Sequence, residues 1–165
     1  MRKYKIDLSE EKHILCNMIT NTSFLQQVKD ICKTTLFETS HSRIVCEWVW
    51  EYYEKTQSAP GRDIQDLYKR KRAQIHNEED LELISEFLST LSKYYETAKI
   101  NNVDYELHKA EQYFKLRSLE QLCRTVEKTV DDRVPEIGEK YVSEYRRIEK
   151  QTGEGVDLLR DSKSI

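Results

Sequence analysis

The sequence is poor in residues that interrupt helices, because only 4 of its 165 residues are glycine and only 2 are proline. Strand-rich folds need many turns, and turns use these two residues heavily. Their scarcity argues against such folds and favours a few long helices joined by short loops. Residues 101–130 are the clearest example, since they contain neither glycine nor proline.

Long apolar runs and paired cysteine motifs are also missing. No stretch of 18 apolar residues occurs, and residues 1–10 are polar and charged, so neither a membrane span nor an apolar leader is expected. The four cysteines form no CxxC pair. We expect a soluble, cytoplasmic protein whose thiols are reduced and act as small buried hydrophobes.

Recognisable catalytic and cofactor-binding motifs are absent as well. The sequence has no GxxxxGK[ST] loop for nucleotide phosphates and no HExxH pair for zinc. His13 and Cys16 lie one helical turn apart, but nothing nearby completes a metal site. The acids at 78–80 are better explained as favourable charge at a helix start. We therefore expect no catalytic residue, no cofactor and no metal in this chain, and an enzyme with an unrecognised site is the weakest alternative.

The charge balance gives little support to DNA binding. The chain has 27 basic and 30 acidic residues, a net charge of −3, whereas duplex-binding domains usually show a positive excess. One basic cluster stands out, formed by Lys69, Arg70, Lys71 and Arg72. It is either a solvated helix face or a contact for phosphate or an acidic partner. A small helical nucleic-acid-binding or regulatory protein using this cluster is the alternative function.

What the sequence does contain is helical periodicity and aromatic bulk, with 10 Tyr, 4 Phe and 2 Trp. Apolar positions recur at three and four from Ile14, and Ser9, Asp63, Asn77 and Asn102 or Asp104 are candidate helix caps. The predicted helices, separated by a short loop at 34–37 and a turn at 57–63, are 9–19, 24–32, 40–56, 63–75, 77–98, 102–130 and 136–151.

These helices predict an all-α fold with a compact, orthogonal multi-helix bundle followed by a long helical hairpin. The predicted domain covers residues 1–130, with the hairpin at about 78–130. In the hairpin, helices 84–95 and 105–123 would be antiparallel neighbours. A linker helix is expected over 131–152, with Pro135 in its first turn, and a flexible exit segment over 153–165.

The order of these features resembles a known family. An opening "SEEKHILCNMI" helix is followed by "FLQQVKDIC", a loop ending in Phe37, "HSRIVCEWVWEYYEK", a turn at "SAPGRDI" and a late "DYELHKAEQYFKLRSLEQLC" helix. This order is similar to the N-terminal domain of DnaB-family replicative DNA helicases, especially their phage-type relatives, over roughly residues 8–130. The family's opening Pro-x-x-x-Glu-Ala-Glu phrase is replaced by Leu8-Ser9-Glu10-Glu11, and its ATPase domain is missing.

The resemblance implies a non-catalytic scaffold that pairs into dimers and builds the collar of a helicase ring, a hexamer in the full protein. A linker would join it to a motor domain, and its surface would be offered to primase or other replication proteins. DNA would be a partner only indirectly. ATP and Mg would be cofactors only of a motor domain following Ile165.

The expected interaction residues lie on the two last helices of the domain and on the linker helix, and all of them except Ile148 are aromatic. For self-association or partner binding they are Tyr94, Tyr95, Tyr105, Tyr113 and Phe114. For docking of the linker on a neighbouring motor domain they are Tyr141, Tyr145 and Ile148. Each of these side chains has an alternative role in the intramolecular core, and for Tyr113 and Phe114 the two roles are evenly balanced.

Overall fold

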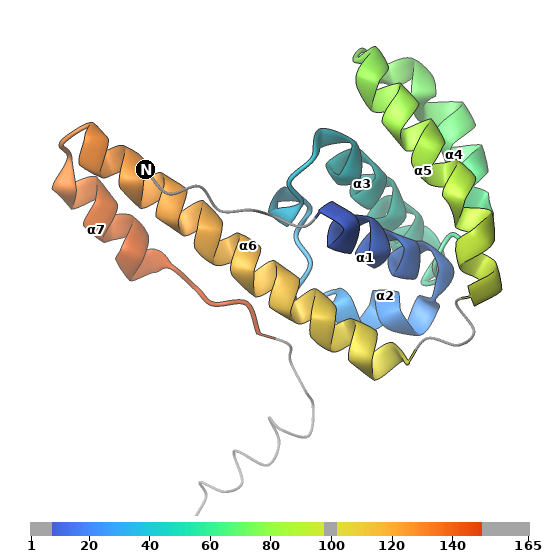
Figure 1. Ribbon diagram of the computed structural model, residues 1–165, viewed down its shortest axis with the longest axis horizontal. Coiled ribbons are helices and arrows are strands. Elements are labelled where there is room, and N and C mark those ends of the chain that lie inside the picture. Colours follow the sequence, from blue (N-terminus) through green and yellow to red (C-terminus); the bar gives the residue numbers. More distant parts are fainter. Residues whose placement is uncertain (1–7, 98–101, 150–165) are drawn as a thin grey trace, which may run out of the picture.

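The computed structural model describes residues 8–97 and 102–149, without the side chains of residues 8, 92 and 95–97. Within these ranges the chain forms seven α-helices, two short 3₁₀ helices and no strand, so the predicted all-α class is confirmed. None of the helices in the described part is long and apolar enough to cross a membrane. Figure 1 shows a cluster of short helices from which one long helix extends.

The first half of the chain forms most of the bundle, and its helices begin close to the predicted positions, although the second one ends at Val28, four residues earlier than predicted. These helices are α1 (Leu8–Thr20), α2 (Thr22–Val28), η1 (Thr34–Leu36) and α3 (Ser40–Thr56). Asn21 caps α2 by accepting a hydrogen bond from the backbone N–H of Phe24. The predicted loop at 34–37 is η1 and its C-cap, and it buries Leu36 and Phe37 as expected.

Two more helices complete the bundle: α4 (Asp63–Lys71), followed by η2 (Arg72–Gln74), and α5 (Glu78–Thr97). Asn77 caps α5 as predicted, with its side-chain oxygen accepting from the backbone of Glu79 and Asp80. Asp63 is not the cap of α4 but its first residue, because its carboxylate instead accepts from the hydroxyl of Tyr52 at 2.6 Å.

The core lies where α1, α2 and α3 meet α5 and the first half of α6 (Val103–Asp131). Its completely buried side chains include both branched and aromatic residues, for example Ile19, Phe24, Phe37, Val49 and Phe114. Phe37 and Phe114 meet edge to face, with 5.6 Å between ring centroids, so the loop after η1 is packed directly against α6.

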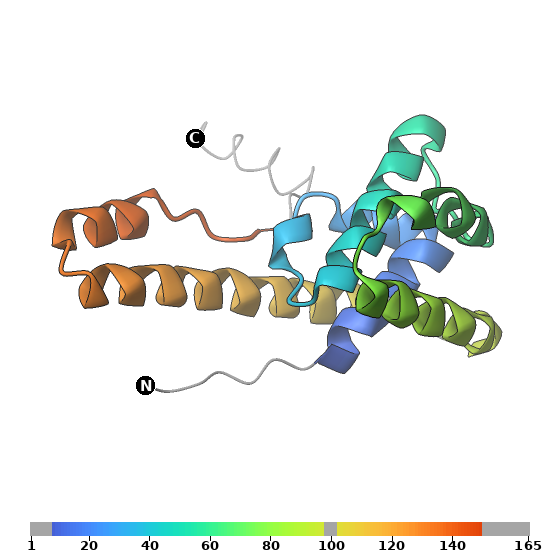
Figure 2. The same ribbon diagram turned by 90° about the horizontal axis from the view of Figure 1, so that it is seen from above.

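The long helix reverses into α7 (Pro135–Glu144), and the two helices lie antiparallel in both views (Figures 1 and 2). Asn102 caps α6 by accepting from the backbone of Tyr105, as predicted. Gly138 of α7 lies against Thr129 of α6, and a Cβ at Gly138 would meet the Thr129 hydroxyl oxygen at 2.4 Å. Glycine therefore permits the close approach of the two helices.

The predicted hairpin of residues 84–95 with 105–123 is wrong. α5 packs on α1 and α3, whereas α6 packs on α1, α2 and α7, and α5 and α6 diverge in both views (Figures 1 and 2). The predicted linker helix is also shorter than expected, because α7 ends at Glu144 and residues 145–149 have no helical structure. The predicted exit segment 153–165 lies outside the described residues.

Candidate functional site

An apolar stripe runs along the outer face of the second half of α6. It is formed by Leu116, Leu119, Cys123, Val126 and Val130, which are separated by three, four, three and four residues. Leu116 is 64% exposed, Leu119 47% and Val130 68%, Cys123 is exposed and Val126 is half-buried. Alternation of three and four is the spacing of a coiled-coil seam, so this stripe is narrow and lies on one face.

The opposite face of α6 is fixed to the bundle, which is why the stripe faces outward. Leu107, Ala110 and Phe114 are buried in the core on that face. From residue 121 onward Thr129 is the one buried side chain of α6, and it faces α7. The second half of the helix, which carries the stripe, is therefore supported by α7, and Figure 2 shows that this half of the helix extends beyond the bundle.

A buried carboxylate on α1 fixes the rotation of α6. Glu11 is 1% exposed and accepts hydrogen bonds from the Tyr113 hydroxyl at 2.6 Å, from the backbone of Glu38 at 2.5 Å and from the Thr39 hydroxyl at 2.7 Å. Burial by itself raises the pKa of Glu11, but these hydrogen bonds, led by that from Tyr113, outweigh burial and hold the pKa below its ordinary value. A buried charge with several donors tolerates little displacement.

A buried arginine makes a second connection between α6 and the segment around η1. Arg117 is 2% exposed, its Nε donates to the carbonyl of Leu36 at 2.6 Å, and its Nη2 lies 3.2 Å from a carboxylate oxygen of Glu38. Its Nη1 pairs with the buried carboxylate of Glu120. Arg124, half exposed, reaches the same two carboxylates. The buried carboxylate of Glu120 and the partly exposed carboxylate of Glu38 are thus both paired with arginine.

A third polar group connects α6 with the other end of α1 and with α5. The buried carboxylate of Glu106 accepts from the side-chain amide of Asn17 at 3.1 Å and lies 2.9 Å from Nε2 of His13. Asn17 in turn accepts from the hydroxyl of Tyr94 on α5. These three groups join residues far apart in sequence, and they orient the first half of α6 against the bundle.

The structure gives different outcomes for the five predicted interaction aromatics. Tyr113 and Phe114 are buried in the core of this chain, which is the intramolecular role that the sequence left evenly balanced with an interaction surface. Tyr94 is half-buried and bonded to Asn17, whereas Tyr105 is 60% exposed near the start of α6. The side chain of Tyr95 lies outside the described residues.

The predicted linker-docking residues also divide. Tyr141 is exposed on α7, and so are its neighbours Ile137 and Val142. Tyr145 is half-buried, and its hydroxyl oxygen accepts from the Ser118 hydroxyl of α6 at 3.1 Å. Ile148 is 6% exposed and belongs to the core of this chain. Ile148 is therefore not available to a neighbouring domain in this arrangement, which corrects the prediction for that residue.

The basic cluster at residues 69–72 lies at the end of α4 and in η2. Lys71 pairs with Glu51 of α3 at 2.8 Å, and the guanidinium of Arg72 lies over the ring of Tyr68, 5.8 Å from its centroid. Lys69 and Arg70 are exposed. Two of the four cations therefore have partners in this chain, and positive charge at a helix C-terminus is favourable in itself.

Metal ligands do not gather in the part of the chain that the structure describes, where no group of three or more His, Cys, Asp or Glu side chains is placed to hold an ion. His13 and Cys16, one turn apart on α1, have separate environments. His13 faces Glu106, while burial raises the pKa of Cys16 to about 12, which keeps that thiol protonated.

Sequence reasoning missed the exposed stripe and the buried charges. The spacing of Leu119, Cys123, Val126 and Val130 places them on one helix face but does not tell whether that face is buried or exposed, although the narrowing of the apolar pattern toward the end of the helix was a usable signal. Glu11 had a signal too, because it shares the apolar face of α1 with Leu15. No comparable signal identifies the ion pairs of Arg117, since i,i+3 pairs are also common on exposed helices.

Comparison of the chain with protein-family models, with curated proteins and with solved structures found no match.

Proposed function

We propose that this chain is a non-catalytic scaffold domain that self-associates through the apolar stripe of α6. The observation that supports the proposal is the exposure of Leu116, Leu119 and Val130 on a helix whose other face is fixed by buried charges. Apolar residues on one continuous line of an extended helix indicate a protein interaction surface rather than a reaction site.

A second copy of the same chain is the occupant that fits the stripe best. A seam with alternating spacings of three and four residues packs its side chains into the holes of a helix that has the same spacing. The stripe has no charged residue among its five members, so two copies related by a twofold axis bury no unpaired charge between them. Each Å² of apolar surface removed from water contributes roughly 25 cal/mol.

On the resemblance to the DnaB family, the scaffold is the N-terminal domain, with its linker region, of a phage-type replicative DNA helicase acting in the cytoplasm. Self-association would organise the helicase ring, and the domain would offer a surface to primase or other replication proteins. The bundle with an extending helical hairpin is an arrangement that suits this role. ATP and Mg would act in a motor domain and not in the residues described.

The oligomeric state tests the first part of the proposal. We expect light scattering after size exclusion to give a mass above 19.7 kDa at high protein concentration, and we expect Leu119→Glu to restore the monomer. An isologous interface receives two buried carboxylates from this one substitution, which predicts a loss of dimer affinity of about 100-fold or more. Ser143→Glu, on exposed α7, adds the same charge outside the stripe and should leave the dimer intact.

A monomer at all concentrations, or a Leu119→Glu variant that assembles like the wild type, would contradict self-association through the stripe. The helicase assignment has its own test. The reading frame downstream of the codon for Ile165 should continue into a GxxxxGK[ST] loop, and a stop codon there would contradict a motor domain in the same chain.

The alternative function, nucleic-acid binding through the basic cluster, depends on the exposed side chains of Lys69 and Arg70. Phosphate contacts predict an affinity that falls steeply with salt and is weakened by alanine at all four basic positions. Absence of binding to duplex and single-stranded DNA at about 50 mM salt would remove this alternative.

A further inference from the structure

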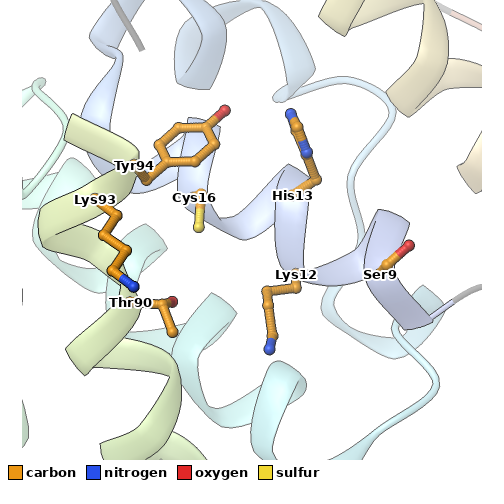
Figure 3. Close-up of a pocket in the computed structure, with 7 residues that line it drawn as sticks. All are labelled: Ser9, Lys12, His13, Cys16, Thr90, Lys93 and Tyr94. Atoms are coloured by element: carbon orange, nitrogen blue, oxygen red, sulfur yellow. The ribbon is translucent and has the colours of Figure 1, made fainter. Parts of the chain in front are cut away.

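A cavity lies between α1 and α5, away from the stripe of α6. Its volume is about 300 Å³, and its lining consists of Ser9, Lys12, His13, Cys16, Thr90, Lys93 and Tyr94. Figure 3 shows the rings of His13 and Tyr94 on one side of Cys16, and the side chains of Lys12, Lys93 and Thr90 on the other. The two sides therefore differ in chemistry, with aromatic groups facing amines across a thiol.

The aromatic side of the cavity presents mainly carbon. The rings of His13 and Tyr94 meet edge to face at an interplanar angle of 88°, with 5.4 Å between their centroids. The Tyr94 hydroxyl donates to Asn17, and Nε2 of His13 faces the Glu106 carboxylate at 2.9 Å without a hydrogen bond to it. The ring carbons, together with the buried sulfur of Cys16, are left to form an apolar wall.

The opposite side of the cavity is positive. Two of the seven lining residues are lysines, one is histidine and none is an acid. Lys12 and Lys93 are both exposed to solvent at the mouth of the cavity. The Thr90 hydroxyl donates its hydrogen bond to the carbonyl of Phe87 at 2.7 Å, so it is not a donor for a ligand in the cavity. Positive side chains on one side of a cavity attract an anion.

We propose that this cavity binds a small organic anion, with a single carboxylate or phosphate monoester between Lys12 and Lys93 and a short apolar body against Cys16 and Tyr94. The size limits the body to about one ring. A cavity of roughly 150 Å³ holds a benzene molecule, and ordinary ligand pockets begin at roughly 300 Å³. The site does not depend on self-association, because none of its residues lies on α6.

Titration of the ¹⁵N-labelled protein with phenyl phosphate, benzoate and benzyl alcohol, followed by amide chemical shifts, tests the proposal. We expect saturable shifts in α1 and α5 with both anions, and shifts at least about 10-fold weaker with the neutral alcohol, because a charge-assisted contact accounts for roughly 1.5 kcal/mol or more. The ratio of the two anion affinities distinguishes a carboxylate site from a phosphate site.

Lys12→Gln and Lys93→Gln should each weaken anion binding by about 3- to 10-fold without changing the helical circular dichroism, because both side chains are exposed. Lys140→Gln, which removes an exposed lysine from α7, is the matched control and should leave the affinity unchanged. The proposal is overturned if neither anion gives saturable shifts below about 10 mM, if the Lys12/Lys93 double variant binds like the wild type, or if the shifts map to the stripe on α6.

Discussion

The hydroxyl of Tyr113 donates a hydrogen bond to the carboxylate of Glu11 over 2.6 Å, although 102 residues separate the two in sequence. The contact joins the first helix of the bundle to the long helix that extends from it. It also places a charged group at a position where the sequence pattern predicts an apolar side chain. The stability and orientation of α6 therefore depend on polar contacts as well as on apolar packing.

The Glu11 carboxylate makes the stability of the protein depend on pH in the acid range. Its pKa is lower in the folded protein than the ordinary value of 4.5, so its contribution is fully present above about pH 4.5 and is lost as the pH falls through the folded pKa. We expect the free energy of unfolding, measured by urea denaturation between pH 3 and 7, to fall less steeply with acid in Glu11→Gln than in the wild type.

Tyr113→Phe isolates the hydrogen bond from the packing, because only the hydroxyl is removed. The loss of one donor to a buried carboxylate should reduce the free energy of unfolding by about 1–3 kcal/mol at pH 7, and by less at pH 3. Tyr105→Phe, on the exposed part of α6, should change it by less than about 0.5 kcal/mol. Equal effects of the two substitutions would contradict the buried network.

Gly138→Ala tests the close approach of α6 and α7. Alanine favours a helix by about 1 kcal/mol over glycine, but its Cβ would lie 2.4 Å from Oγ1 of Thr129. We therefore expect the substitution to reduce the free energy of unfolding, measured by thermal denaturation, by about 1–2 kcal/mol. In a Thr129→Ala background the same change should be neutral or stabilising. An additive double-mutant cycle would show that the two residues do not meet.

Arg117→Ala removes the cation that pairs with the carboxylates of Glu38 and Glu120 near the middle of α6. The Glu120 side chain is 4% exposed and would be left buried without this partner. We therefore expect the free energy of unfolding to fall by about 3–5 kcal/mol. Arg124 contacts the same acids from a side chain that is 52% exposed, so Arg124→Ala should cost less than about 1 kcal/mol. Chemical denaturation gives the free energy of unfolding of both variants. Similar losses in the two variants would contradict the buried ion pair of Arg117 with Glu120.

Ile148 tests whether the segment after α7 packs on its own chain. Ile148→Ala should reduce the free energy of unfolding by about 2–5 kcal/mol, since the side chain belongs to the core. Val142→Ala, which changes an exposed residue of α7, is the control and should have little effect. If Ile148→Ala left the free energy of unfolding unchanged, the original prediction that this residue is free for a neighbouring domain would stand again.

The cysteines provide a test that links reactivity to self-association. Cys123 is exposed within the stripe, whereas Cys16, Cys32 and Cys46 are buried. An aromatic disulfide reagent should therefore label one thiol of the native protein rapidly at neutral pH, and Cys123→Ser should abolish the rapid phase. If two copies pack through the stripe, the rate should fall as protein concentration rises, and a rate independent of concentration would count against that packing.

The sequence by itself determined the all-α class, the ends of most helices and two of the caps. These properties depend on neighbours within one turn, such as Asn77 and Asn102 with the backbone N–H groups that follow them. The apolar residues of α3 were likewise identifiable from their spacing, because period and burial are coupled in an amphipathic helix.

Only the tertiary structure decided which helix pairs with α6, and therefore which of its residues are exposed. Tyr113 and Leu119 are both apolar positions of one helix, yet one is buried and the other is 47% exposed. The difference depends on contacts with residues far away in sequence, such as Glu11, and on the space that Gly138 leaves for α7. Periodicity describes the faces of a helix, but the identity of the surface that covers each face is a property of the whole chain.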